Sequence, residues 1–216
     1  MQNIKNTPEW KQYEWLITKI FYDDYSELQT SIVPNTKLHG EKSKISRQID
    51  ILIEKNNIKT IIECKHHKRP LDVKAIESFI SMFDDIKGNY GIIITSGGFT
   101  KSAYNRIEEY PIKLEHLKWE DAYINSFNEQ SYGRINDICN HCNSNFKIGK
   151  EIPGLLLWDS GYGLEKDGKV YIYHIAECLK CNNKTLYCDS CGITTIVGKD
   201  EPCCQEAIIF INNFNT

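Results

Sequence analysis

The apolar positions in the first part of the chain recur at helical spacing. Thr7 is a candidate N-cap, and Pro8 suits the first position of a helix. Apolar residues then follow three or four positions apart at Trp10, Tyr13, Leu16, Ile17, Ile20 and Phe21. This pattern predicts a helix over residues 8–24. The segment TSIVPN, residues 30–35, predicts a short first strand, and the polar, lysine-rich residues 36–47 predict a loop.

Two apolar runs around an Asn-Asn pair at 56–57 predict a β-hairpin over residues 47–66. Asparagine at both loop positions favours a two-residue turn with positive φ at each. Counting outward from this turn places Asp50 directly opposite Glu63, on the face that also carries Lys65. The other face collects apolar side chains and is expected to be the core side: Ile49, Ile51, Ile53, Ile62 and Cys64. A four-residue loop would reverse this parity and move Asp50 to the other face.

Helical and strand patterns alternate along the next part of the chain. Apolar residues at helical spacing predict a helix over 71–86, and the continuous apolar run of 89–100 predicts a central strand covered on both faces. Thr100 is then a candidate cap for a short helix, and residues 112–123 predict a last strand and helix. This order predicts an α/β fold with a mixed sheet flanked by helices, in which the antiparallel hairpin joins a parallel strand through a crossover helix.

The cysteines divide the chain into two parts. Eight of the nine follow residue 138, as three Cys-x-x-Cys pairs and one vicinal pair. They are Cys139, Cys142, Cys178, Cys181, Cys188, Cys191, Cys203 and Cys204. Thiolates in such pairs are the preferred ligands of structural Zn²⁺, so eight of them predict two four-cysteine zinc sites. We therefore expect a first domain over 1–125, a linker over 126–137 and a small β-rich, zinc-ribbon-like domain over 138–216.

The sequence favours one pairing of these cysteines and leaves others open. A predicted hairpin between the first two Cys-x-x-Cys pairs, with its turn at 166–168, favours joining those two pairs in one site, as in a zinc ribbon. The third pair and the vicinal pair then form the second site, with a short strand over 192–198 between them. In an interleaved alternative the first pair joins the third. In another, His141 or His174 replaces one of the vicinal cysteines, because the side chains of neighbouring residues diverge.

Composition and charge narrow the classes of function. The 216 residues, 41% hydrophobic and 25% charged, suit one sizeable globular domain plus a small one. The net charge of -3 excludes a generally basic protein, so any nucleic-acid surface must be local. No apolar run approaches roughly 18 residues, and the N-terminus has no apolar signal-peptide core, which predicts a cytoplasmic protein without membrane contact. A reducing compartment favours metal binding by the cysteines over disulfides.

The opposed acids of the hairpin need a compensating charge. Two carboxylates that face each other on a sheet repel, and a hard divalent cation such as Mg²⁺ binds carboxylate oxygens while leaving positions open for water and phosphate. Lys65 beside them would stabilise charge on a phosphoryl group, or orient and help deprotonate the attacking water. Asp50, Glu63 and Lys65 therefore predict a centre for phosphodiester hydrolysis. The alternative is that they form only the solvated face of a hairpin.

The stretches QIDILI, TIIECK and GIIITSGGFTKSA together resemble the PD-(D/E)XK nuclease superfamily, and within it the Mrr-like restriction endonucleases, over residues 8–122. The resemblance implies a restriction-endonuclease-like fold in which Asp50 and Glu63 bind Mg²⁺, Lys65 is the catalytic lysine and Glu14 is an additional acid on the first helix. The residue before Asp50 is isoleucine, where the superfamily name has proline. The resemblance also implies a Mg²⁺-dependent endodeoxyribonuclease that cuts double-stranded DNA as a homodimer, in restriction of foreign DNA.

Basic residues beside the hairpin are candidates for contacts with DNA phosphates, and the alternative is that they are solvated loop residues. They are Lys44, Arg47, Lys68, Arg69 and Lys101. The cysteine-rich part holds more acidic than basic residues, and its aromatic residues are expected to pack a ribbon sheet rather than stack on bases. Whether this part binds DNA, binds protein or only stabilises the fold stays open. Two alternative functions are a repair or junction-processing nuclease, and a zinc-ribbon binding protein whose nuclease fold is inactive.

Overall fold

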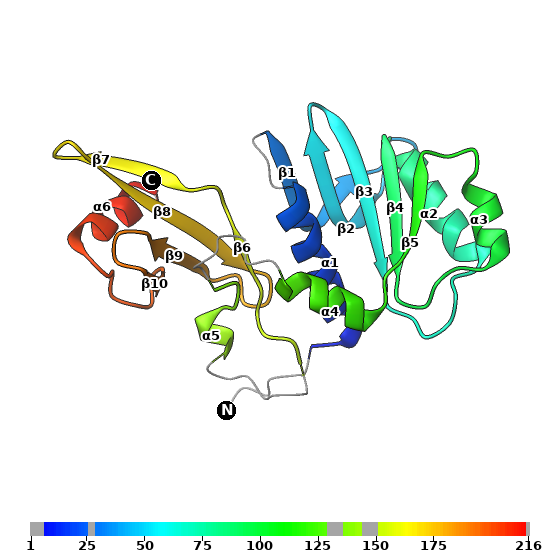
Figure 1. The fold of residues 1–216 in the computed structure, drawn as a ribbon. Coiled ribbons are helices and arrows are strands. Elements are labelled where there is room, and N and C mark those ends of the chain that lie inside the picture. The colour runs from blue at the N-terminus through cyan, green and yellow to red at the C-terminus, as the bar shows by residue number, and fades with distance from the viewer. Residues whose placement is uncertain (1–6, 26–28, 129–135, 144–150, 215–216) are drawn as a thin grey trace. The chain divides into compact units, whose positions relative to one another are not determined.

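The computed structural model of the chain describes residues 7–25, 29–128, 136–143 and 151–214. The chain divides into two compact units, Met1–Asn128 and Glu129–Thr216 (Figure 1). The first unit is a mixed α/β sheet with helices on both faces, and the second is β-rich. This is the fold class that the hydrophobic pattern predicts.

The first unit contains one five-stranded sheet in the order β1-β2-β3-β4-β5. Strands β1, β2 and β3 pair antiparallel, whereas β3, β4 and β5 pair parallel, with α2 and α3 as the crossover helices. The elements are α1 (Glu9–Tyr25), β1 (Thr30–His39), β2 (Ser46–Lys55), β3 (Ile58–Lys65), α2 (Val73–Asp85), β4 (Tyr90–Thr95), α3 (Lys101–Ile107), β5 (Ile112–His116) and α4 (Trp119–Asn128).

Side-chain caps begin α2 and α3, and the cap of α3 is the predicted Thr100. Asp72 accepts a hydrogen bond from the Ala75 amide at the start of α2, at 3.2 Å. Thr100 accepts one from the Ala103 amide at the start of α3, at 3.3 Å. Each bond satisfies an amide that the first helical turn leaves without a backbone acceptor. The predicted helix over 8–24 is confirmed as α1.

Helices cover both faces of the sheet, so both faces of the β2–β3 hairpin are buried (Figure 1). On the face toward α2, Leu52 and Ile61 join a cluster with Phe79 and Ile80. Ile49 belongs to this same cluster, although simple alternation predicts it on the other face together with Ile51. The prediction of a single core face is therefore wrong. Helices cover both faces of the sheet, so both faces of a central hairpin are buried.

The predicted loop over residues 36–47 is also wrong for half of its length, because residues 36–39 and 46–47 belong to strands. Strand β1 continues to His39 and pairs with β2 through Thr36 opposite Ile49 and Leu38 opposite Arg47. Its side chains alternate between half-buried and exposed along the whole strand. An edge strand with one solvated side tolerates polar residues. Pairing with β2 here outweighs the weak preference of these polar residues for a loop.

The turn that remains, residues 40–45, is held by the buried carboxylate of Asp85 at the end of α2. Asp85 accepts hydrogen bonds from the amides of Lys42 and Ser43 and from Arg47 Nε, the last at 2.7 Å. These bonds keep the pKa of Asp85 well below its usual range. A Cβ at Gly40 would lie 2.2 Å from Asp85 Oδ2, so the close approach requires glycine there.

The second unit contains a five-stranded antiparallel sheet in which β10, β9, β8 and β6 follow one another and β7 also pairs with β8. The predicted hairpin turn is confirmed, because Lys166 pairs with Lys169 around Asp167 and Gly168, both with positive φ. The elements are α5 (Asn140–Asn143), β6 (Leu156–Trp158), β7 (Tyr162–Lys166), β8 (Lys169–Cys178), β9 (Lys184–Cys188), β10 (Ile193–Ile196) and α6 (Gln205–Phe214). Helix α6 adds an element that the sequence does not predict.

Aromatic residues of the second unit pack its interior. Tyr173 stacks on Phe210 of α6 with ring centroids 4.5 Å apart, in a cluster that also holds Tyr171. Trp158 and Tyr187 are buried together in a second cluster. The expected packing role is confirmed, because Trp158, Tyr173 and Tyr187 are buried and Tyr171 is partly buried against the same interior.

Helix α4 runs to Asn128, into the predicted linker over 126–137, and Ser126 is buried with its hydroxyl bonded to the carbonyl of Leu16. Linker residues 129–135 lie outside the described residues.

Among the described helices, none combines the length and the apolar character that a membrane span requires.

Candidate active site

The turn of the β2–β3 hairpin has the predicted two-residue loop. Asn56 and Asn57 both have positive φ, 51° and 63°, and Lys55 pairs with Ile58. The ladder continues in register to Ile51 opposite Ile62. The four-residue loop is excluded, and Asp50 is the residue of β2 that directly precedes the last ladder pair.

Asp50 sits where the ladder ends and binds the neighbouring strand directly. Its Oδ2 accepts a hydrogen bond from the amide of Cys64 at 2.8 Å, next to Glu63. The carboxylate of Glu63, 18% exposed, forms an ion pair with the ammonium of Lys65. Both residues lie near the carboxyl end of β3, where Glu63 is opposite Ile93 and the parallel β4 also ends. Ligands of α/β sheets commonly bind at this end of the strands.

Helix α1 brings the fourth predicted residue, Glu14, to the same place. Tyr13 is fully buried, and its hydroxyl donates to the carbonyl of Leu117 at 2.7 Å, which fixes the helix against the segment between β5 and α4. Glu14 follows directly and is 9% exposed. Its carboxylate interacts electrostatically with Asp50 and with Lys65. The structure therefore brings Asp50, Glu63, Lys65 and Glu14 together.

Burial destabilises the ionised forms of these carboxyl groups. It raises the pKa of Asp50, of Glu63 and of Glu14, and the negative charge of Asp50 raises the pKa of Glu63 and of Glu14 further. Burial alone would lower the pKa of Lys65, but Glu63 and Asp50 outweigh it and raise that pKa above its usual value. Carboxylates that are crowded and partly desolvated gain most from a bound cation, and their oxygens are the donors that hard divalent ions prefer.

A second lysine belongs to this cluster, and the sequence analysis missed it. Lys11 Nζ lies 2.5 Å from Glu14 Oε2, and the charge of Lys11 lowers the pKa of both Glu14 and Asp50. The available signal was the spacing, because residues three apart lie on the same side of a helix. Among the described residues, the cluster thus holds three carboxylates and two ammonium groups.

His66 follows Lys65 and packs against the inner side of the cluster. Its ring packs against those of Tyr13 and Trp119, with centroids 5.4 and 5.2 Å away, and those two rings also stack on each other. Its Nδ1 is 2.9 Å from Ser96 Oγ at the end of β4. These contacts fix the end of β3, and hence the backbone that carries Lys65.

The predicted DNA-contacting residues separate into two groups. Lys68 and Arg69 are exposed and follow β3, and the carbonyl of Arg69 lies against Gly97, in the turn that leads to Lys101 at the start of α3. These three residues share the end of the sheet that carries Lys65. Arg47 instead binds Asp85 at the C-terminal end of α2. Lys44 lies in the same turn, so the structure does not bring these two residues to the acids.

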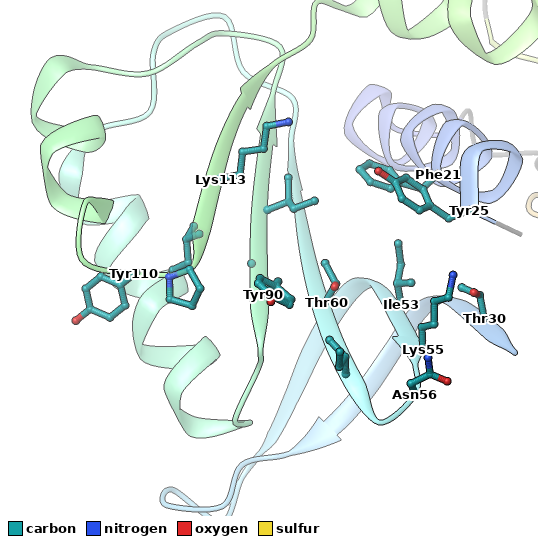
Figure 2. A pocket seen from close by; sticks show the side chains of 15 residues that line it. Phe21, Tyr25, Thr30, Ile53, Lys55, Asn56, Thr60, Tyr90, Tyr110 and Lys113 are labelled. Carbon is teal, nitrogen blue, oxygen red and sulfur yellow. The ribbon is translucent and has the colours of Figure 1, made fainter. Parts of the chain in front are cut away.

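A groove of about 690 Å³ lies at the opposite end of the same strands (Figure 2). Figure 2 shows Phe21 and Tyr25 of α1 facing side chains of the sheet, among them Ile53, Thr60 and Tyr90. The groove adjoins the Asn-Asn turn and the beginning of β4, whereas Glu63 lies near the carboxyl end of β3. It is therefore separate from the acidic cluster.

The eight cysteines of the second unit form two groups of four. In each group the four Sγ atoms lie within 4.8 Å of one another. One group joins Cys139, Cys142, Cys178 and Cys181, and the other joins Cys188, Cys191, Cys203 and Cys204. The favoured pairing is confirmed and the interleaved pairing is wrong.

The vicinal cysteines both take part in the second group. The Sγ atoms of Cys203 and Cys204 are 3.8 Å apart, so the expected divergence of neighbouring side chains does not remove either of them. Within the described residues, His141 and His174 belong to neither group. Each group presents four thiols at the spacing of a tetrahedral metal site.

Comparison with known proteins gives one match to a family and several to solved structures. The restriction endonuclease model of the Mrr catalytic type matches residues 8–118, more than half of the chain. The protein of unknown function AF1548 is 18% identical, with a TM-score of 0.43, over 48% of this chain and 56% of that chain. The DNA modification-dependent restriction endonuclease AspBHI is 13% identical, with a TM-score of 0.34, over 54% of this chain and 31% of that chain.

The apo structure of EndoMS is 14% identical, with a TM-score of 0.30, over 49% of this chain and 46% of that chain. This chain therefore spans less than two thirds of each of these structures. No curated protein matches it. The family model covers α1 and all five strands of the first unit, and with them every residue of the acidic cluster. The chain belongs to the restriction endonuclease family of the Mrr catalytic type.

Proposed function

We propose that the protein is a Mg²⁺-dependent DNA endonuclease whose reaction centre is formed by Asp50, Glu63, Lys65 and Glu14. The observation that carries this proposal is their convergence. Two come from one strand, one from its hairpin partner and one from α1, and all four meet at the carboxyl ends of β3 and β4. Three partly buried carboxylates at one point repel one another and destabilise the fold. Their convergence therefore favours a functional role over a structural one.

Asp50 and Glu63 would hold the cation, and Glu14 would complete its ligand set from α1. When bound, the cation polarises the phosphate and lowers the pKa of a coordinated water. The Cys64 amide holds Asp50 in place, and Tyr13 holds the helix that carries Glu14. A preformed site of this kind loses little entropy when the substrate binds.

Lys65 would act as a cation rather than as a base. The carboxylates of Glu63 and Asp50 raise the pKa of Lys65 above its usual value, which favours the charged ammonium over the free amine. The same charge stabilises negative charge that develops on the phosphoryl oxygens in the transition state. We therefore assign Lys65 to charge stabilisation and leave deprotonation of the water to the cation site.

The DNA substrate would reach the centre over the end of the sheet that presents Lys68, Arg69 and Lys101. These residues are exposed and basic and lie on the two segments that flank Lys65. Contacts from such residues to phosphates position DNA without reading its sequence. Arg47 is engaged by Asp85, so its first role is to hold the turn between β1 and β2.

The two four-cysteine groups would bind Zn²⁺ and stabilise the second unit. Closed sites with four thiolate ligands leave no open position for substrate, so their role is structural. A homodimer, a cytoplasmic location and a role in defence against foreign DNA complete the proposal, and they rest on the family resemblance.

The experiment is a plasmid cleavage assay with purified protein, Mg²⁺ and supercoiled DNA of different methylation states. The wild type is expected to nick and linearise the plasmid and to stop when EDTA is added. Asp50→Asn and Lys65→Met are each expected to lower the rate at least about a hundredfold. Lys74→Met, which removes an exposed lysine from α2, is the matched control and is expected to cut normally.

Three outcomes would contradict the proposal. The wild type could leave DNA intact under every metal and methylation state, the variants could cut as fast as the wild type, or cleavage could continue in EDTA. A strong preference for branched over linear duplex DNA would instead assign the same centre to repair or junction processing.

A further inference from the structure

Lys11 neutralises one of the residues proposed to bind the cation. Its Nζ lies 2.5 Å from Glu14 Oε2, and the exposed fractions of the two side chains are 22% and 11%. Both residues are on α1, three positions apart, so the helix itself keeps them adjacent. A charged hydrogen bond in a partly desolvated position is stronger than a surface ion pair.

Each carboxylate of the cluster has its own partner in the described structure. Glu63 has the Lys65 ammonium, Asp50 has the Cys64 amide, and Glu14 has Lys11. A cation that takes Glu14 Oε2 as a ligand competes with Lys11 for the lone pairs of that oxygen, and its charge repels the ammonium held there.

We propose that Lys11 is a resident counter-ion that competes with the divalent cation for Glu14. In the protein without metal, the ammonium occupies the position from which Glu14 would bind the cation. Binding of the cation releases Lys11 from that carboxylate. This inference rests on the proposed function, since it concerns the same cation site.

The competition sets how tightly the site binds metal. A unit charge and a double charge about 6 Å apart in a water-like dielectric repel enough to change an affinity roughly tenfold. Removing the ammonium while keeping the bulk of its side chain should therefore tighten divalent-ion binding by about that factor.

The test is isothermal titration of the DNA-free, full-length protein with Ca²⁺, which gives a dissociation constant that does not depend on cleavage. Lys11→Met is expected to lower the Ca²⁺ dissociation constant about tenfold. Lys11→Gln, which keeps a hydrogen-bond donor but loses the charge, is expected to act in the same direction. Lys74→Met is the control and is expected to leave the constant unchanged. Thermal unfolding in EDTA checks that each variant is folded.

A second arm asks whether Lys11 acts through Glu14. In a Glu14→Gln background, Lys11→Met is expected to change the dissociation constant by less than about twofold, because the carboxylate for which it competes is gone. An equal gain in both backgrounds would overturn the proposal in favour of a general charge effect.

Different results would refute the competition by Lys11 and the assignment as a nuclease. If the wild type binds Ca²⁺ and cuts DNA, but neither Lys11 variant binds Ca²⁺ more tightly, the competition is refuted and the nuclease assignment stands. If the wild type neither binds Ca²⁺ nor cuts DNA with any metal, both are refuted.

Discussion

Replacing Cys142 with alanine should remove one zinc ion and destabilise the second unit. Cys142 Sγ lies 3.8 Å from Cys178 Sγ across a span of 36 residues. A cross-link that closes a span of this length removes about 4 kcal/mol of conformational entropy from the unfolded chain. In the proposed zinc site the metal would supply that cross-link, so the loss of one ligand should lower the free energy of unfolding by up to about this amount. For a unit of this size, the loss corresponds to a fall in Tm of roughly 15–30 °C.

The assay combines metal content with thermal unfolding. The wild type is expected to carry two equivalents of zinc, measured by mass spectrometry of the metal, and Cys142→Ala one. Cys191→Ala is expected to lose the other ion with a smaller effect of about 3 kcal/mol, because the span from Cys191 to Cys203 is much shorter. Cys64→Ala is the matched control: Cys64 lies in β3, outside both groups of the described structure, and its loss should leave two equivalents bound.

Two results would refute this reasoning. One is a Cys142→Ala protein that keeps both equivalents and the wild-type Tm. The other is a wild type that unfolds at the same temperature before and after complete removal of its metal. Either would mean that the four thiols pack together without forming a metal cross-link.

Three further predictions concern the first unit. Tyr13→Phe leaves the carbonyl of Leu117 without its donor and should lower the free energy of unfolding by about 1–3 kcal/mol in a denaturant titration; an unchanged midpoint would contradict it. Burial raises the pKa of Asp50, so ionising it costs stability as the pH rises from its ordinary value of 3.8 through the raised pKa. Asp50→Asn should therefore unfold in EDTA at pH 8 at a temperature no lower than that of the wild type. Asp85 has a lowered pKa, so its stabilising effect is complete above pH 3.8 and is lost only as the pH falls through that lowered pKa. The difference in stability between wild type and Asp85→Asn should shrink only in that acidic range.

The parts of the site that lie on the hairpin are readable from the sequence because short-range geometry determines them. The Asn-Asn pair fixes a two-residue turn, and a two-residue turn fixes the register. Extrapolating that register predicts Asp50 beside Glu63 without any knowledge of the rest of the fold, and the observed ladder runs to the pair just before them, Ile51 and Ile62. The cysteine pairs are readable for a similar reason, since a Cys-x-x-Cys turn presents two thiols to one point.

The features that the sequence does not reveal depend on contacts between distant segments. The polar residues after Pro34 form a strand only because β2 lies beside them. Ile49 leaves its expected face for the cluster under α2, which no local pattern predicts. Helix α6 forms against Tyr173 and Leu186, and its short apolar run alone does not distinguish helix from strand.

Lys11 was overlooked for a different reason. Its position three residues before Glu14 is visible in the sequence, but a lysine near a glutamate on a helix is usually a solvated pair. The decisive fact is that Glu14 is buried beside Asp50, and only the packing of α1 against β3 establishes that.

The most direct test of the central claim is to locate a divalent cation by anomalous diffraction from crystals that contain Mn²⁺. The account predicts a peak about 2.1 Å from carboxylate oxygens of both Asp50 and Glu63, with Glu14 turned toward it and away from Lys11. It also predicts that the peak disappears in Asp50→Asn. A fully occupied Mn²⁺ at another place in the first unit, with these acids uncoordinated, would contradict the account.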